Sequence, residues 1–360
     1  IPEDTGETIL RLILSNIPTP TTRALADPCF PGLDLSKSTI LQGSPSITIY
    51  EPVLTLPRSA GLLKTFHQFT YFLIKVIYNF VLNIFNVTTN TIKKVAIIIK
   101  KSDKKTISLV SKIIETLYNN KLEIFIINPL EHKLAKTILS IKELNQIEID
   151  MAISIGGDGT LLRLIRDLRK EIPVLGINSG GKGIITEIIP EQIEDACKNI
   201  INKNYMLESR IRLQCTIGKQ QFKPVLNEVY FIRTEITKTP YYKVKLNGKE
   251  VLDNRMDGLV IATPTGSTGH SLSLGGPVLV EDDENILITP IGSVSNIPSI
   301  VSKSKEIEIT SDNEMIIVLD GQEKYKIEQD KSIVIKKNEF NAILIRFDNT
   351  MLKQMKKMIR

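Results

Sequence analysis

Residues 151–162 read Met-Ala-Ile-Ser-Ile-Gly-Gly-Asp-Gly-Thr-Leu-Leu, and no other stretch of the chain says more about the fold. A short apolar run ends in a glycine-rich loop, and an amphipathic segment follows. This order predicts a strand, a tight turn and a helix. Glycines let a phosphate approach the backbone, and the N-terminus of the helix would offer free N–H groups to an anion.

The loop predicts a phosphate site with one acid in it. Gly156, Gly157, Gly159 and Thr160 are the candidate donor-binding residues, and Asp158 is the only carboxylate among them. An acid beside a bound phosphate can hold a metal ion or take a proton from an acceptor hydroxyl, which is the chemistry of phosphoryl transfer. The loop alone leaves both roles open.

Strands and helices are predicted to alternate from residue 93 onward. This rhythm implies a doubly wound α/β domain over residues 93–205, with a parallel sheet and ligands at the carboxyl ends of its strands. A second glycine-rich strand end, Ser179–Gly183, should lie beside the first. The predicted strands are 95–99, 122–127, 150–155 and 173–178, and the predicted helices cover 107–117, 134–141, 161–168 and 190–204.

The pattern changes after residue 205, because short β-rich runs replace helical spacing. Residues 206–346 are therefore expected to form a mostly antiparallel β domain, with Asn247-Gly248 as its clearest hairpin turn. A short basic helix in the C-terminal segment 347–360 is expected to return to the first domain. Eight runs predict strands, at 211–217, 225–232, 241–246, 259–262, 307–310, 315–319, 332–335 and 342–347.

Residues 1–90 form an extension whose structure and role the sequence does not predict. About half of the prolines lie in its first 60 residues, and the apolar segment 62–85 is interrupted by Lys64, His67 and Lys75. A membrane-spanning helix needs about 20 nearly uncharged residues. The segment is therefore expected to be a packed or membrane-surface helix, and membrane contact is not expected to be part of the function.

Composition excludes several classes. The chain has 360 residues, 42% hydrophobic and 24% charged, with a net charge of +6. Because no block of Lys and Arg with interleaved aromatics occurs, we expect no nucleic-acid partner. Three widely spaced cysteines, Cys29, Cys197 and Cys215, and three histidines make neither a disulfide framework nor a structural zinc site. A reducing cytoplasm fits this cysteine usage.

A second loop, residues 257–277, follows an apolar strand and is dense in hydroxyls and glycines. Short hydrogen bonds from such a loop suit a flat, polar ligand, although a surface loop rich in turn formers has the same composition. The presence of the phosphate loop earlier in the chain favours a ligand site.

Taken in order, these motifs resemble the NAD kinase family. The resemblance covers roughly residues 93–350 and is specific because all the elements occur in sequence, whereas lipid kinases and phosphofructokinases carry relatives of the first motif alone. The matching segments are Gly156–Thr160, Gly176-Ile177-Asn178, Gly183 with Thr186-Glu187, Asn227-Glu228, Asp257-Gly258, Thr263–Thr268, Ser271–Pro277 and Asp320-Gly321-Gln322.

The resemblance implies transfer of a phosphate from ATP, or from polyphosphate, to the 2′-hydroxyl of the adenosine ribose of NAD. It implies that Asp158 is the catalytic acid–base residue, that a divalent cation, Mg²⁺ with ATP, is the cofactor, and that the chain forms a homodimer or homotetramer. No metal ligands are assigned within the protein. The implied NAD-binding residues are Asn227, Glu228, Asp257, Thr265, Thr268, Gly269, His270 and Ser273.

Two departures from the family pattern affect the expected NAD site. Gly269-His270 stands where many members have Ala-Tyr, and Pro290–Val294 lacks the family's Pro-His. A histidine can stack on a nucleotide, but more weakly than tyrosine and with a pH-dependent charge. A lipid kinase of the same superfamily and a catalytically silent dinucleotide-binding regulator are the alternatives. The Asn-Glu pair argues against the first, and the intact Asp158 argues against the second.

Overall fold

The computed structural model describes residues 92–100, 103–127, 130–348 and 353–359, and the backbone of two strands before them. Those strands, β1 (Ser38–Gln42) and β2 (Thr48–Pro52), pair antiparallel within a separate unit, Ile1–Asn86. The helix expected at 62–85 lies outside the described residues. The second unit, Val87–Arg360, contains all the other described helices and strands.

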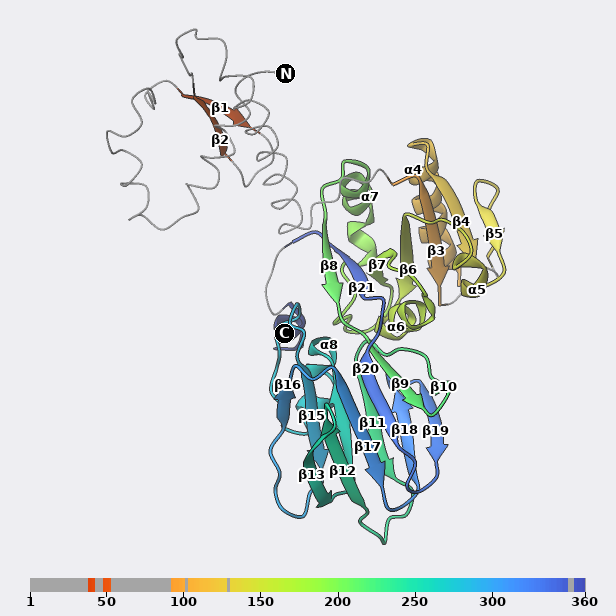
Figure 1. Ribbon diagram of the computed structural model, residues 1–360. Helices are drawn as coiled ribbons and strands as arrows, with labels where there is room; N and C mark the ends of the chain where they lie inside the picture. The colour runs from red at the N-terminus through yellow and green to blue at the C-terminus, as the bar shows by residue number, and fades with distance from the viewer. Residues whose placement is uncertain are drawn as a thin grey trace, which may run out of the picture. The chain divides into compact units, whose positions relative to one another are not determined.

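A seven-stranded sheet in the order β5-β4-β3-β6-β7-β21-β8 forms the first half of this unit (Figure 1). Its first five strands along the chain run parallel to one another, as the alternating pattern predicts. They are β3 (Lys94–Ile99), β4 (Glu123–Ile127), β5 (Lys136–Ile138), β6 (Met151–Gly156) and β7 (Pro173–Asn178).

Helices cover both faces of this sheet, which confirms the doubly wound arrangement. Alternate residues of the buried strands point to opposite faces. One face packs on α4 (Lys104–Asn119) and α7 (Ile193–Ile201), which follows the short 3₁₀ turn Pro190–Gln192. The other face packs on α5 (Ile141–Leu144) and α6 (Asp158–Asp167).

The helix predicted at residues 134–141 is wrong. Lys136–Ile138 is instead the edge strand β5, which pairs with β4. A separate helix begins after Ser140. The Ser140 hydroxyl accepts the N–H of Glu143 at 3.3 Å, and the Glu143 carboxylate accepts the N–H of Leu139 at 2.7 Å. This reciprocal capping begins the one-turn helix α5.

Two strands extend the parallel sheet beyond the limits expected at residues 206 and 346. Strand β21 (Ala342–Arg346) pairs parallel with β7, and β8 (Met206–Arg210) pairs antiparallel with β21. The chain therefore crosses between the halves twice, after β8 and before β21. The expected boundaries differ from the observed ones because a strand's sheet depends on its partner, not on its own pattern.

The second half is a sandwich of two six-stranded antiparallel sheets, as expected for a mostly β domain. Both sheets contribute to one core, in which Phe231, Tyr242 and Ile309 are buried. Asn247 and Gly248 both have positive φ, as the turn between β12 and β13 requires. One sheet contains β10 (Gln220–Gln221), β9 (Leu213–Ile217), β20 (Ile333–Lys337), β17 (Glu306–Ser311), β12 (Tyr241–Leu246) and β13 (Lys249–Arg255). The other contains β16 (Ile300–Ser302), β15 (Ile286–Ile291), β14 (Gly258–Ala262), β11 (Glu228–Arg233), β18 (Met315–Leu319) and β19 (Glu323–Ile327).

The predicted C-terminal helix is present as α10 (Lys353–Ile359) and contacts both halves. The backbone N–H of Gln354 donates to Glu281 at 2.9 Å, in the second half, and Lys357 donates to the carbonyl of Thr186, in the first. Within the ranges that the structure describes, no helix is long and apolar enough to cross a membrane.

Candidate active site

A cavity of about 290 Å³ lies at the carboxyl ends of three parallel strands. Strand β3 lies between β4 and β6, so the connections leave it toward opposite edges of the sheet. Such a switch point opens a crevice at the strand ends where doubly wound proteins bind ligands. The cavity is lined by Lys100 after β3, by Gly156 and Gly157 after β6, and by Ser179–Gly181 after β7. The two glycine-rich ends are neighbours as predicted, because the N–H of Ser179 donates to the carbonyl of Gly156 at 3.0 Å.

Glycine has a steric role at the first loop. A β-carbon on Gly156 would collide with the side chain of Thr160, whereas a β-carbon on Gly157 would meet open space. Gly157 is the N-cap of α6 and contributes no capping side chain. The positive end of α6 therefore faces the cavity without a competing oxygen, which suits an anionic phosphate.

Cations that the sequence analysis did not single out also line this cavity. Lys100 and Lys105 lie on its wall with Thr106, at the start of α4. Their positive charges complement the glycine loop, whereas the α4 N-terminus is capped by the carboxylate of Asp103, which accepts the N–H of Thr106 at 2.9 Å. The sequence signal that could have identified these cations is a second strand-to-helix junction, directly after β3, that carries lysines.

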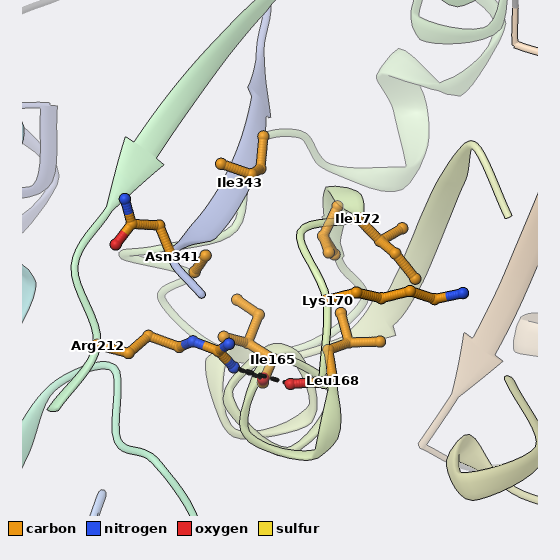
Figure 2. Close-up of a pocket in the computed structure, with 9 residues that line it drawn as sticks. Ile165, Leu168, Lys170, Ile172, Arg212, Asn341 and Ile343 are labelled. Carbon is orange, nitrogen blue, oxygen red and sulfur yellow. Dashed lines mark hydrogen bonds between the residues drawn. The ribbon is translucent and has the colours of Figure 1, made fainter. Parts of the chain in front are cut away.

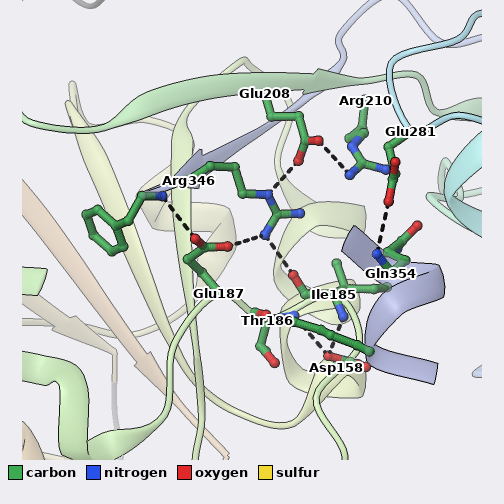
Figure 3. Close-up of polar contacts among 11 residues, drawn as sticks. Asp158, Ile185, Thr186, Glu187, Glu208, Arg210, Glu281, Arg346 and Gln354 are labelled. Carbon is green, nitrogen blue, oxygen red and sulfur yellow. Dashed lines mark hydrogen bonds and ion pairs between the residues drawn. The ribbon is translucent and has the colours of Figure 1, made fainter. Parts of the chain in front are cut away.

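Asp158 is half-buried in the first turn of α6, and its carboxylate is held by backbone alone (Figure 3). Ile184, Ile185 and Thr186 donate their N–H groups to it at 2.7, 3.1 and 3.1 Å. The turn before these residues needs Gly183, which has a φ of 63° and no room for a β-carbon beside Asn178. The Gly183 and Thr186 positions of the family pattern therefore shape the seat of Asp158.

A second acid, Asp320, organises the Asn-Glu pair. Its carboxylate accepts the backbone N–H groups of Leu226, Asn227 and Glu228 at 3.0, 2.7 and 3.2 Å. Burial raises the pKa of Asp320 to about 6, although these three N–H groups lower it. The sequence analysis noted Asp320 as part of a motif but did not predict this role.

Asn227 and Glu228 present buried acceptors that have no hydrogen-bond partner in the described part of the chain. These atoms are Asn227 Oδ1 and Glu228 Oε2. Burial, and then the charge of Asp320, raise the pKa of Glu228 to about 8. Buried polar atoms without partners are rare and costly in native proteins. They mark the place where a ligand with hydrogen-bonding groups is missing.

Gln322 connects this pair to the phosphate loop. Its Nε2 donates to the carbonyl of Gly159 at 3.0 Å, and its Oε1 accepts from Arg166 of α6 at 3.0 Å. Arg166 is buried and also pairs with Glu323 at 3.2 Å. The turn Asp320–Gln322 therefore holds the Asn-Glu pair with its first residue and the start of α6 with its last.

The hydroxyl-rich loop folds beside the Asn-Glu pair, since the N–H of Thr263 donates to the carbonyl of Asn227 at 2.9 Å. Most of its hydroxyls, however, have partners within the loop or next to it. Thr263 caps α8 (Pro264–Ser267) through the N–H of Gly266 at 3.1 Å, and Thr268 donates to the carbonyl of Thr265 at 3.2 Å. Thr265 itself accepts from Arg210 at 3.2 Å.

The next residues lie on the exposed side of the same loop. Gly269 is exposed, and a β-carbon there would lie 3.5 Å from Glu228 Oε2. His270 opens α9 (His270–Ser273) and packs edge-on against Tyr230, with ring centroids 5.0 Å apart. The Ser273 hydroxyl donates to the carbonyl of His270 at 2.7 Å. Gly269 is therefore beside the orphaned acceptor of Glu228, and both Gly269 and His270 are open to solvent.

Asp257 is the one predicted site residue that the fold places elsewhere. It precedes β14, whereas the Thr263 loop follows it, and a five-residue strand separates the two by about 17 Å. Asp257 pairs with Arg233 at 3.1 Å. The hydroxyl-rich loop and the Asn-Glu pair are neighbours in the second half, and Gln322 links that half to the glycine loop.

Comparison with known proteins gives a consistent result. Residues 95–205 match the ATP-NAD kinase N-terminal domain family, and residues 226–347 match the ATP-NAD kinase C-terminal domain family. An NAD kinase from Thermoplasma volcanium is 30% identical over 260 residues, which are 71% of this chain and 93% of the relative. An NAD kinase from Methanopyrus kandleri is 35% identical over 214 residues, which are 58% of this chain and 77% of the relative.

Solved structures agree. A crystal structure of an NAD kinase from Archaeoglobus fulgidus in complex with ATP is 29% identical, with a TM-score of 0.59 over 74% of this chain and 97% of the other. A yeast NADH kinase complexed with NADH has a TM-score of 0.67 over 76% of this chain and 88% of the other. At 18% identity, the yeast protein supports the fold alone.

Proposed function

Because the chain belongs to the NAD kinase family, we propose that it transfers the terminal phosphate of ATP to the 2′-hydroxyl of the adenosine ribose of NAD, forming NADP. One observation carries the proposal. Gln322 of the turn that holds the orphaned acceptors Asn227 and Glu228 donates to Gly159, which directly follows Asp158 in the glycine loop. Neither a lipid kinase nor a silent regulator is favoured by any feature of the site.

The two halves divide the work in this proposal. The α/β half binds the donor phosphates through Gly156, Gly157, Gly159 and Thr160, with Lys100 and Lys105 supplying positive charge. The β half binds the dinucleotide. Asn227 Oδ1 and Glu228 Oε2 take hydrogen bonds from its adenine and ribose, and Thr265, Thr268, Gly269, His270 and Ser273 line the rest of the NAD site.

Asp158 acts as the general base. A ribose hydroxyl is a weak nucleophile, and a carboxylate at hydrogen-bond distance can take its proton as the bond to phosphorus forms. Three backbone N–H groups keep the carboxylate in one position, so it need not reorganise when the acceptor arrives. The glycine N–H groups and the start of α6 stabilise the negative charge of the transferred group.

Mg²⁺ is proposed to arrive with the triphosphate. In the described ranges, no group of three or more His, Cys, Asp or Glu side chains could hold a metal ion by itself. Asp158 is the only acid of the glycine loop, and three N–H groups already use its oxygens. These residues fit a cation carried by phosphate oxygens, where it neutralises charge on the donor.

We further propose a homodimer or homotetramer in the cytoplasm. The position of Asp257 supports an oligomer, because one chain alone keeps this residue at the far end of β14 from the other NAD-binding residues. A second copy could bring its Asp257 to that site. The buried, free thiols of Cys197 and Cys215 are compatible with a reducing compartment.

The direct test is to incubate the purified chain with ATP, Mg²⁺ and NAD and to measure NADP with an NADP-specific dehydrogenase. Formation of NADP supports the proposal, and its absence in the wild type refutes it. Asp158→Asn should lower kcat at least about 100-fold and leave the KM for NAD within about 3-fold, as loss of a general base requires. Asp167→Asn is the matched control, because this acid ends the same helix and pairs with Lys223 at 2.9 Å. Equal kcat values for Asp158→Asn and Asp167→Asn would show that Asp158 is not the general base.

A further inference from the structure

A buried arginine from the end of the chain reaches the seat of Asp158. Arg346 ends β21 and is 6% exposed. Its Nη1 donates to the carbonyl of Ile185 and to the Glu187 carboxylate, both at 3.0 Å, and its Nε donates to Glu208 at 2.5 Å (Figure 3). None of the motifs discussed above includes Arg346.

The contact with Ile185 acts on the peptide group that holds Asp158. The carbonyl of Ile185 and the N–H of Thr186 belong to one peptide unit, and that N–H donates to Asp158 Oδ1 at 3.1 Å. A guanidinium bound to the carbonyl side fixes the plane of this unit. It also polarises the N–H on the other side, since linked hydrogen bonds strengthen one another.

The surroundings of Arg346 keep its charge and orientation. Burial lowers the pKa of Arg346, but the nearby carboxylates of Glu208 and Glu187 raise it by more, so the net shift is upward. The planar guanidinium can reach both acids and the Ile185 carbonyl at once, which the single ammonium of a lysine cannot. Glu208 also accepts from Arg210 at 2.8 Å, and Arg210 donates to Thr265. One network therefore joins the seat of Asp158 to the hydroxyl-rich loop.

We propose that Arg346 is a positioning residue for phosphoryl transfer: through the peptide between Ile185 and Thr186, it holds the Asp158 carboxylate in its productive orientation. The proposal rests on the function proposed above. It requires no contact between Arg346 and either substrate. Its effect must therefore pass through Asp158, which gives it a distinct kinetic signature.

The chain offers a matched control in Arg212, which is also buried and also binds backbone carbonyls. Arg212 Nη1 donates to the carbonyls of Ile165 and Leu168 at 2.7 and 3.0 Å, at the opposite end of α6 from Asp158 (Figure 2). Replacing Arg212 removes a comparable buried guanidinium at the junction of the halves and leaves residues 184–186 untouched.

The experiment measures kcat and KM for NADP formation in Arg346→Met, Arg346→Lys and Arg212→Lys. We expect Arg346→Met to lower kcat at least about 10-fold, with both KM values within about 3-fold, and Arg346→Lys to recover part of that loss. Arg212→Lys should keep kcat within about 3-fold of the wild type. If Arg346→Met does not fold, Arg346→Lys against Arg212→Lys remains the deciding comparison.

A double-mutant cycle separates positioning from a general structural effect. In the Asp158→Asn background, Arg346→Met should lower kcat by less than about 2-fold, because the group that it positions has been removed. The proposal would be overturned if the kcat losses of Asp158→Asn and Arg346→Met multiplied in the double variant. It would also be overturned if Arg346→Met lowered kcat no more than Arg212→Lys does. An inactive wild type would refute the proposed function instead, so the two failures are distinguishable.

Discussion

Glu228 should make the stability of the protein fall as pH rises through neutrality. Its pKa is raised from 4.5 to about 8 by burial and by the charge of Asp320. Between these two values the unfolded chain has lost the proton and the folded chain still holds it. The folded state then binds more protons, so the free energy of unfolding decreases with pH, at a rate of about 1.4 kcal/mol per pH unit for one full proton. Glu228→Gln carries no titratable proton and removes this slope.

The magnitude follows from the pH window. From pH 6 to pH 8 the wild type should lose roughly 2 kcal/mol of unfolding free energy relative to Glu228→Gln, and the difference should level off above about pH 8. At pH 6 the wild type should already be about 2 kcal/mol less stable than Glu228→Gln, because the loss begins near the unfolded-state pKa of 4.5. Asp320 titrates in both proteins, so the comparison isolates Glu228.

Urea unfolding of both proteins by circular dichroism, at four pH values from 6 to 9 and one ionic strength, measures the difference. Glu323→Gln is the control. Burial raises the pKa of Glu323, but Tyr325, Arg166 and Lys223 lower it by more, so this acid is ionised in both states throughout the range. The difference in unfolding free energy between Glu323→Gln and the wild type should therefore be the same at every pH. A constant difference for Glu228→Gln as well would refute the argument and show that this carboxyl is ionised in the folded protein.

Two further predictions concern packing and thiol reactivity. Gly266→Ala should lower the free energy of unfolding by about 1–3 kcal/mol, because the new β-carbon would collide with the carbonyl of Asn227. A urea titration should find this variant less stable than Gly157→Ala, whose new β-carbon meets open space. Equal stability of the two variants would contradict the steric argument. Burial raises the pKa of Cys197 to about 11 and that of Cys215 to about 12. In a Cys29→Ser variant, a thiol reagent at pH 8 should therefore react with native protein at least about 100-fold more slowly than with protein in urea, and a fast native reaction would exclude this burial.

The parallel sheet and its glycine loop could be predicted because their signals are local. Each central strand is a short apolar run, and the helices that follow keep one apolar face. The same local approach failed at residues 134–141, where Leu134, Ile138 and Ile141 fit a helical period. Three apolar residues cannot distinguish a helix from an edge strand followed by a capped turn. The available partner, β4, decided the outcome.

The membership of β8 and β21 could not be predicted for a related reason. Each is a short strand next to the β-rich region in the chain, and sequence proximity assigned both to it. Strand β21 pairs with β7, which lies about 165 residues before it, and β8 pairs with β21, which lies about 130 residues after it. Only the folded sheet shows that the C-terminal strand closes the domain that begins at residue 93.

The hydroxyl-rich loop lies beside the Asn-Glu pair, but its hydroxyl groups are used differently from the prediction. Its hydroxyl groups were expected to bind a ligand, and Thr263 and Thr268 use theirs to cap and brace the loop. The unsatisfied acceptors belong to Asn227 and Glu228, whose placement depends on Asp320, some 90 residues later. A motif shows which side chains take part, but only packing shows which of their atoms remain available.

Residues outside the motifs therefore determine how the motif residues are used. Asp158 lies in the first half, and the Asn-Glu pair lies in the second. The distance between the Asp158 carboxylate and the ribose hydroxyl of the bound dinucleotide therefore depends on how the halves are joined. Two buried arginines cross that junction, since Arg166 pairs with Glu323, and Arg210, which is held by Glu208, donates to Thr265. Buried ion pairs contribute little net stability, but removing one partner is costly. Such a junction is sensitive to geometry, as expected if it sets the position of a catalytic carboxylate relative to a bound dinucleotide.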